Sequence, residues 1–193
     1  MRNKLYAITG GIGSGKSTAT LALKLAGYNT ISCDEIVRIL YTKRTILRAI
    51  KRVFPTAVTG KYFLTVDKKE IARLAFSDKE SYDKLTLLIT HKTMQHALRK
   101  AKRLKGIVFI EVPLLYEFGY QGFFDGVIVI TRAIEDRLKS VMARSNMTEE
   151  EFYSRVTTQI NYAKYDFKNA IVIKNDNTPN DLTDKVLEIA KTL

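Results

Sequence analysis

The sequence predicts an α/β protein in which helices cover both faces of a five-stranded parallel sheet. Short apolar runs alternate along the chain with longer helical patterns, and several of these runs are apolar at nearly every position. Strands that are buried on both faces have this composition. A glycine-rich segment, GGIGSGKS, directly follows the first run and fits the phosphate-binding pattern G-x-x-x-x-G-K-[ST]. Together these observations predict a three-layer α/β/α P-loop NTPase core.

Five strands are expected where the apolar runs fall. They are predicted at 5–9, 30–32, 107–112, 126–130 and 170–173. Runs such as IVFIEV and GVIVI match a sheet that is covered on both faces. The gap between the second and third strands is about 70 residues, far longer than an ordinary crossover. We therefore expect an insertion in this gap.

Helices are expected in the segments between and after the strands. In the core they are predicted at 17–26, which Gly27 ends, and at 178–193. Within the insertion they are predicted at 35–54, 68–76 and 79–104, with a turn at 55–60. A further pair is predicted at 133–144 and 148–166, where Thr148 and Glu151 form a capping box. The insertion is therefore expected to be largely helical, and the later pair to hinge at 145–147.

Composition excludes several classes of protein. Hydrophobic residues make up 46% of the 193 residues, as in folded chains, and no apolar run approaches the roughly 20 residues of a membrane span. The N-terminal stretch has no signal-peptide pattern, so we expect a cytoplasmic protein without a membrane partner. The single cysteine, Cys33, excludes an internal disulfide, and we expect it to be a small buried side chain.

The net charge of +12 allows two interpretations. Basic clusters at 43–52 and 99–105 can attract nucleic acid or polyphosphate ligands, or they can form solvated helix surfaces. The sequence has no helix-turn-helix, zinc-finger or RNP motif, so no nucleic-acid partner is expected. His91 and His96 have no cysteine partner at zinc-site spacing, and no zinc site is expected.

The P-loop carries the most specific functional signal. Its glycines allow successive backbone N–H groups to point at phosphate oxygens beside a helix N-terminus. Lys16 would reach the terminal phosphates of a nucleoside triphosphate, and the Ser17 hydroxyl would bind Mg²⁺. The residues expected to contact the nucleotide are Gly11, Ile12, Gly13, Ser14, Gly15, Lys16, Ser17 and Thr18.

A P-loop alone leaves kinases, ATPase motors, GTPases and switches open. A Rossmann fingerprint is excluded because Lys16 stands where its last glycine belongs. The chain has no Asn-Lys-x-Asp guanine signature, which disfavours a GTPase. A small-molecule kinase fits the chain length, the helical insertion and the hinged helical pair best.

Two carboxylates follow predicted strands, at the edge of a parallel sheet where ligands bind. Asp34 can accept the proton of an acceptor hydroxyl or help hold the metal, but it can also cap a helix starting at Glu35. Glu111 lies in a Walker-B-like arrangement, where it holds Mg²⁺ from the outer sphere or pairs with a surface lysine. His91 lies on a helical apolar pattern, which favours a core or domain-interface histidine over a catalyst.

Further segments extend the pattern well beyond the P-loop. In order along the chain, these segments are TGGIGSGKST, an acid at Asp34, VDKKEIARLAFSD, ITH and VPLLYE. In these segments, and over residues 7–175 as a whole, the chain resembles the dephospho-coenzyme A kinase family. The resemblance implies a P-loop core, a helical coenzyme A-binding domain and a mobile lid. It also implies that MgATP phosphorylates the ribose 3′-hydroxyl of a small-molecule substrate, dephospho-coenzyme A, in the last step of coenzyme A synthesis.

The resemblance further implies a domain division and roles for single residues. The core would comprise 1–34, 105–132 and 167–193, the coenzyme A-binding insertion 35–104, and the lid 133–166. Asp34 would be the catalytic base, and Lys16 and Ser17 would contact phosphate and metal. Arg144 would approach the ATP phosphates from the lid, although it can instead be an exposed cation at a helix end. Substrate contacts would come from Asp34, Lys68, His91, Pro113, Leu114 and Glu117.

The chain departs from the family's pattern at several positions. Ser32 replaces the first of two acids, Lys92 a proline, Lys68 an arginine, Ser140 a lid arginine, and Asn169-Ala170 an Ala-Asp pair. Arg137 lies on the same helix face as Arg144, so it could compensate for Ser140. These changes fall mostly on acceptor and lid positions and spare the ATP side.

Two alternatives to the kinase of dephospho-coenzyme A therefore stay open. One is a (deoxy)nucleoside monophosphate kinase on the same core, and the other is a non-catalytic paralogue that binds nucleotide. In each case we expect ATP as the nucleotide and a monomer or weak oligomer.

Overall fold

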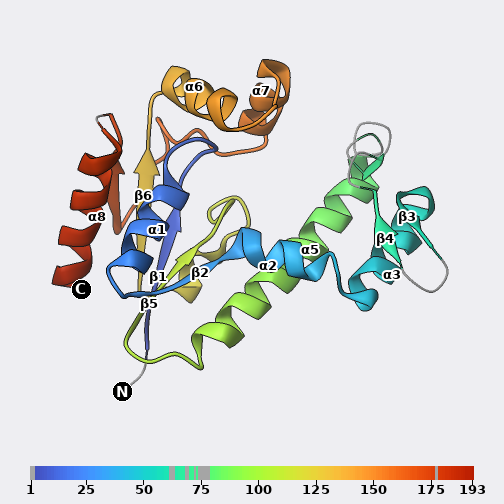
Figure 1. Ribbon diagram of the computed structural model, residues 1–193, viewed down its shortest axis with the longest axis horizontal. Helices are drawn as coiled ribbons and strands as arrows, with labels where there is room; N and C mark the ends of the chain where they lie inside the picture. The colour runs from blue at the N-terminus through green and yellow to red at the C-terminus, as the bar shows by residue number, and fades with distance from the viewer. Residues whose placement is uncertain (1–2, 61–63, 68–69, 72, 74–78, 177) are drawn as a thin grey trace. The chain divides into compact units, whose positions relative to one another are not determined.

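The computed structural model describes residues 3–60, 64–67, 70–71, 73, 79–176 and 178–193 (Figure 1). The chain forms two compact units. The sheet unit comprises Met1–Ser32 and Lys100–Leu193, and the helical unit comprises Cys33–Arg99.

A five-stranded parallel sheet forms the centre of the sheet unit. Its strands are β1 (Lys4–Thr9), β2 (Asn29–Ser32), β5 (Ile107–Glu111), β6 (Gly126–Thr131) and β7 (Ala170–Lys174), in the spatial order β2-β5-β1-β6-β7. Every neighbouring pair is parallel, so the predicted sheet is confirmed. Glu111 pairs with Ile8 of β1 and with Ser32 of β2, which brings the carboxyl ends of the three strands together.

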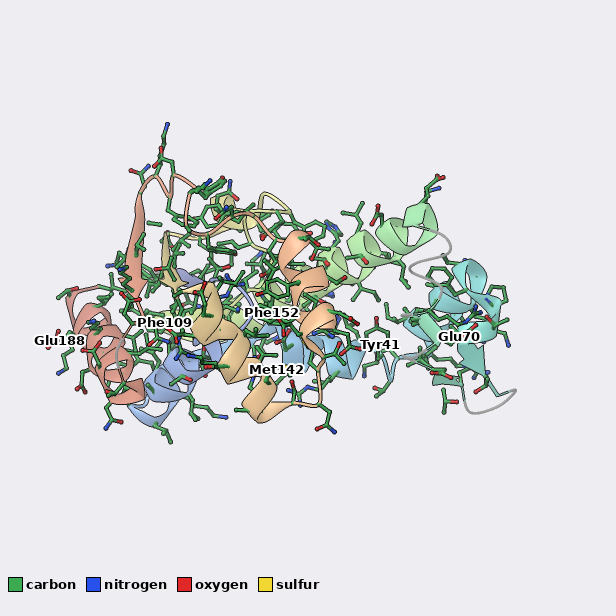
Figure 2. The ribbon with its side chains drawn as sticks, turned by 90° about the horizontal axis from the view of Figure 1, so that it is seen from above. Tyr41, Glu70, Phe109, Met142, Phe152 and Glu188 are labelled. Atoms are coloured by element: carbon green, nitrogen blue, oxygen red, sulfur yellow. The ribbon has the colours of Figure 1, made fainter. Side chains whose placement is uncertain are left out.

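Both faces of this sheet are buried. On one face, Ile8, Phe109 and Ile128 form a core with α1 (Lys16–Leu25) and α8 (Pro179–Thr192). On the other face, residues such as Ala7 and Ile110 have no exposed surface. Figure 2 labels Phe109, which is fully buried in this core. This burial explains the continuous apolar runs, and the predicted α/β fold class is confirmed.

Two helices, α6 (Ile134–Arg144) and α7 (Glu149–Thr157), follow β6 and lie beyond its carboxyl end in Figure 1. The predicted capping box is present, because the Thr148 and Glu151 side chains each bond the other's backbone N–H. The prediction that α7 continues to residue 166 is wrong. The hydroxyl groups of Thr157 and Thr158 donate to carbonyl oxygens one turn back and compete with further helical bonds.

The helical unit begins with α2 (Cys33–Leu40), directly after β2. It continues with α3 (Arg44–Val53) and a short 3₁₀ turn, η1 (Pro55–Ala57). The prediction of one helix over 35–54 is wrong at its middle. There the Thr42 hydroxyl and backbone N–H both bond the Ile39 carbonyl, and the resulting tight turn separates α2 from α3.

The remainder of the helical unit contains a feature that the sequence did not predict. Strands β3 (Val58–Thr59) and β4 (Thr65–Val66) pair antiparallel, where only a turn was expected. The long helix α5 (Lys79–Ala101) is confirmed and ends three residues before the predicted 104. The helix predicted at 68–76 falls largely outside the described residues. Among the described helices, none is both long and apolar enough to cross a bilayer.

Candidate active site

The P-loop adopts backbone angles that favour glycine. Gly10, Gly13 and Gly15 have φ of 150°, 78° and 108°. A Cβ atom at Gly13 would lie 2.6 Å from the backbone oxygen of Arg137, and one at Gly15 would lie 2.7 Å from Nδ2 of Asn175. The loop is therefore packed tightly against its supports, and side chains at these positions would displace it.

Lys16 places its ammonium group over this loop. Its Nζ atom donates to the carbonyl oxygens of Gly10, at 2.7 Å, and of Gly11, at 2.9 Å. Since α1 begins at Lys16, the N–H groups of its first turn are also available to an anion. Ser14 is 1% exposed, and its Oγ atom has no hydrogen-bond partner among the described residues. A cation, a helix N-terminus and an unpaired hydroxyl thus meet at one loop.

Ser17 and Glu111 connect the P-loop to the end of β5. The Ser17 hydroxyl donates to Oε1 of Glu111 at 2.9 Å, and Glu111 is only 4% exposed. A hydroxyl and a carboxylate are oxygen ligands of the kind that Mg²⁺ prefers. Among the described residues there is no cluster of three or more His, Cys, Asp or Glu able to hold a metal. This pair therefore fits Mg²⁺, which proteins hold with few side chains and with substrate phosphates.

Arg137 of α6 packs against the P-loop. It is 7% exposed, its Nε donates to the Ile12 carbonyl at 2.7 Å, and its guanidinium lies 5.9 Å from the centroid of the Phe152 ring. Figure 2 labels Phe152, which is fully buried. Burial lowers the pKa of the Arg137 guanidinium, and the nearby Tyr162 partly offsets this effect. A Cβ on Gly11 would lie 2.6 Å from the Arg137 Nη2, so Gly11 allows this close approach.

Two further side chains hold the loop from other segments. Oε1 of Gln159 accepts a hydrogen bond from the Ile12 N–H at 3.0 Å, and Nδ2 of Asn175 donates to the Ser14 carbonyl at 2.8 Å. Gln159 follows α7, and Asn175 follows β7. The P-loop is thus bonded to side chains from α6, from the segment after α7 and from the end of β7.

The VPLLYE segment forms the turn after β5. Leu114 has a φ of 57°, a left-handed conformation that costs a non-glycine residue about 1–3 kcal/mol. Oε1 of Glu117 accepts a hydrogen bond from the Ile160 N–H at 3.0 Å, and its buried Oε2 has no hydrogen-bond partner among the described residues. Pro113 and Leu114 are half-buried in the same turn. Glu117 therefore fixes the segment after α7, in addition to any contact with substrate.

Tyr162 belongs to the segment after α7 and packs beside β1, the strand that precedes the P-loop. Its hydroxyl lies 3.4 Å from Oγ1 of Thr9, the last residue of β1. Burial raises the pKa of Tyr162, and the negative charge of Glu117 acts in the same direction. The phenol therefore stays neutral, as a group buried against the sheet should.

A cavity of about 900 Å³ opens at the carboxyl ends of β6 and β7. Its lining residues include Arg132, Arg137, Gln159, Tyr162 and, at the end of β7, Lys174. Its volume lies within the range of small-molecule sites in proteins. Because Arg137 and Gln159 also bond Ile12, the cavity reaches the P-loop directly.

The other predicted site residues lie at exposed positions or outside the described part of the chain. Asp34 lies within the first turn of α2 and is exposed, so it is not the cap of a helix starting at Glu35. His91 is exposed on α5, 3.0 Å from Gln95, so it is not a core histidine, and its position at a domain interface stays a prediction. Arg144 is exposed in the last turn of α6, and Thr18 in the first turn of α1. Cys33 is buried, as predicted, and Lys68 lies outside the described residues.

Sequence reasoning did not assign a role to Arg132. It lies directly after β6, and the position of a cation at the carboxyl end of a parallel strand is the signal that could have identified it. Gln159 and Asn175 were also not assigned a role, because their bonds to the loop appear only in the structure.

A family model described as dephospho-CoA kinase matches residues 5–181. This chain belongs to the dephospho-CoA kinase family. A dephospho-CoA kinase of Thermus thermophilus is 32% identical over 179 residues, covering 92% of this chain and 86% of that protein. The family resemblance predicted from the sequence is therefore confirmed.

Solved structures agree with this assignment. A structure of a Thermus thermophilus protein matches with a TM-score of 0.84 and 30% identity, covering 100% of this chain and 99% of the other. A dephospho-CoA kinase from Campylobacter jejuni matches with a TM-score of 0.69 and 25% identity, covering 97% and 95% of the two chains. The prediction of a P-loop kinase that uses ATP and acts on a small molecule is thus confirmed at the level of the family.

Proposed function

We propose that this chain transfers the γ-phosphoryl group of ATP to the ribose 3′-hydroxyl of dephospho-coenzyme A. The products are coenzyme A and ADP, and the reaction is the last step of coenzyme A biosynthesis. The observation that carries the proposal is the family match over residues 5–181, which contains an intact P-loop with Lys16 over it.

On the phosphate side, the proposal uses the sheet unit alone. Loop N–H groups and the N-terminus of α1 bind the phosphate oxygens, and Lys16 exchanges its carbonyl partners for the terminal phosphates. Preorganised donors of this kind stabilise the charge that spreads over the transferred group. Arg144, exposed at the end of α6, adds a guanidinium to the same charge when the lid region 133–166 closes.

Ser17 and Glu111 are the residues that would hold Mg²⁺. When bound, the ion neutralises negative charge on the β- and γ-phosphates. The buried Glu111 keeps the Ser17 hydroxyl oriented toward the end of the sheet, so the oxygen ligand is positioned before the nucleotide arrives.

On the acceptor side, Asp34 takes the proton of the 3′-hydroxyl as the in-line transfer proceeds. Its exposure on α2 leaves the carboxylate accessible to a substrate. We infer that the insertion 35–104 binds the coenzyme A precursor, with contacts from Lys68 and His91. Pro113, Leu114 and Glu117 contribute from the turn after β5, and the strained backbone of Leu114 is the kind of feature found at ligand sites.

Release of ADP with MgATP and a panel of acceptors tests this function. We expect release with dephospho-coenzyme A and only background release without an acceptor or with Lys16→Met. Faster release with dCMP or a similar nucleotide would instead indicate a nucleoside monophosphate kinase. ATP binding without acceptor-dependent release of ADP would indicate a non-catalytic paralogue. This alternative is considered because Ser32 and Ser140 replace an acid and an arginine of the family's pattern.

A further inference from the structure

The cavity beside the P-loop has walls of two kinds. Arg137 and Gln159 form the part that adjoins the loop, and both bond Ile12. Tyr165 and Phe167 form another part, with ring centroids 5.0 Å apart. A ligand whose phosphates sit in the loop can therefore extend a flat aromatic group toward rings that suit its stacking.

Three cations line this cavity, and two of them are already engaged. The Arg137 Nε is bonded to the Ile12 carbonyl, and its guanidinium lies over the Phe152 ring. Lys174 forms an ion pair with Asp176 at 2.8 Å. Arg137, whose helix position allowed it to compensate for Ser140, is instead bonded to the loop. The third cation is Arg132.

Arg132 is held by Ser140 itself. Its Nη1 donates to the Ser140 hydroxyl at 2.6 Å, so the guanidinium lies beside the helix position from which the family's lid arginine is missing. Its Nε is buried and has no hydrogen-bond partner among the described residues. Ser140 is a neutral partner, so this hydrogen bond does not compensate the guanidinium's charge, and such a group is suited to contact a ligand.

We propose that Arg132 supplies the guanidinium that recognises the purine base of ATP. This proposal rests on the proposed function, because it takes ATP as the nucleotide. Arg132 follows β6 directly, so the rigid sheet fixes its backbone, and the Ser140 hydroxyl fixes its guanidinium plane. A planar, delocalised cation stacks on a heterocyclic ring, whereas the phosphates are bound by Lys16 and the loop.

Equilibrium binding of ATP and of inorganic triphosphate, each with Mg²⁺ and without acceptor, tests this assignment by calorimetry. Arg132→Gln keeps a donor for Ser140 but removes the cation. We expect it to weaken ATP binding roughly tenfold and triphosphate binding less than about twofold. Arg155→Gln, at an exposed arginine on α7 that does not line the cavity, should bind both ligands like the unmodified chain. Unchanged triphosphate binding also shows that the variant retains its folded loop.

A second variant tests the replacement of one arginine by another. Combining Arg132→Gln with Ser140→Arg should restore ATP affinity to within about threefold, because a guanidinium returns to the same place. The assignment is overturned if Arg132→Gln binds ATP normally, if it loses both ligands equally, or if the second change restores nothing. Each of these results concerns ATP binding alone, so they are distinct from a failure to phosphorylate dephospho-coenzyme A, which would overturn the proposed function.

Discussion

The P-loop of the sheet unit and the candidate acceptor residues of the helical unit differ in how the fold supports them. Side chains from three segments bond the loop: Arg137, Gln159 and Asn175. Asp34 and His91, by contrast, are exposed side chains on helices. The P-loop is therefore held by bonds from several segments, whereas the side chains proposed to meet the acceptor lie exposed on their helices. The departures from the family's pattern spare the P-loop, but they occur in both units, since Ser32 and Ser140 belong to the sheet unit and Lys92 to the helical unit.

The largest effect is expected from Asp34→Asn. Loss of the proton acceptor should lower kcat by about 10²–10⁴ while ATP binding is unchanged, because the loop does not depend on this side chain. Glu35→Gln, which removes a charge from the same first turn of α2, is the matched control and should retain turnover. Steady-state kinetics with calorimetry for ATP separates the two effects. Near-normal kcat in Asp34→Asn would contradict the role of Asp34 as the base.

A smaller effect is expected where the loop meets β5. Glu111→Gln keeps the hydrogen bond to Ser17 possible but removes the negative charge near the proposed metal. The Mg²⁺ concentration needed for half-maximal activity should rise about 10–100-fold. Mutation of residues that hydrogen-bond the ligands of other protein metal sites has effects of this size. Titration of activity with Mg²⁺ at saturating ATP measures this shift. An unchanged Mg²⁺ requirement would remove Glu111 from the metal site.

The smallest and most specific contrast lies between two arginines of α6. Arg137→Met should lower the free energy of unfolding by about 2–3 kcal/mol, because it removes a charged hydrogen bond to the Ile12 carbonyl and leaves that oxygen unpaired. Arg144→Met, at an exposed position, should cost less than about 1 kcal/mol but should reduce turnover. Urea unfolding and kinetics of both variants check this. Equal losses in the free energy of unfolding for the two variants would contradict the proposal that Arg137 stabilises the loop whereas Arg144 acts in turnover.

Much of the sheet unit could be predicted from the sequence, because its signals are local. Continuous apolar runs gave the five parallel strands, and GGIGSGKS marked the phosphate site between a strand and a helix. Ser17 and Glu111, both predicted as metal residues, are hydrogen-bonded to each other, and the metal site itself stays a prediction. Strand ends and a glycine-rich loop depend on residues that are neighbours in the sequence, so the sequence pattern is enough to predict them.

The features that the sequence did not predict depend on contacts between distant segments. The end of α7 at Thr157, the antiparallel pair β3–β4 and the burial of Arg137 under the loop have no periodic signal. Arg132 is the clearest case, because the role proposed for it depends on a hydroxyl eight positions away and on a cavity lined by residues from several segments. An arginine in sequence resembles any surface cation until its neighbours are known.

The position of the transferred phosphate tests the central proposal most directly. Phosphorus NMR of the reaction of MgATP with dephospho-coenzyme A should show a new phosphomonoester on the ribose 3′-oxygen, formed in equal amount with ADP. Lys16→Met should form neither product. Release of ADP without this phosphomonoester, or its appearance on a nucleoside monophosphate in preference to dephospho-coenzyme A, would contradict the proposed function.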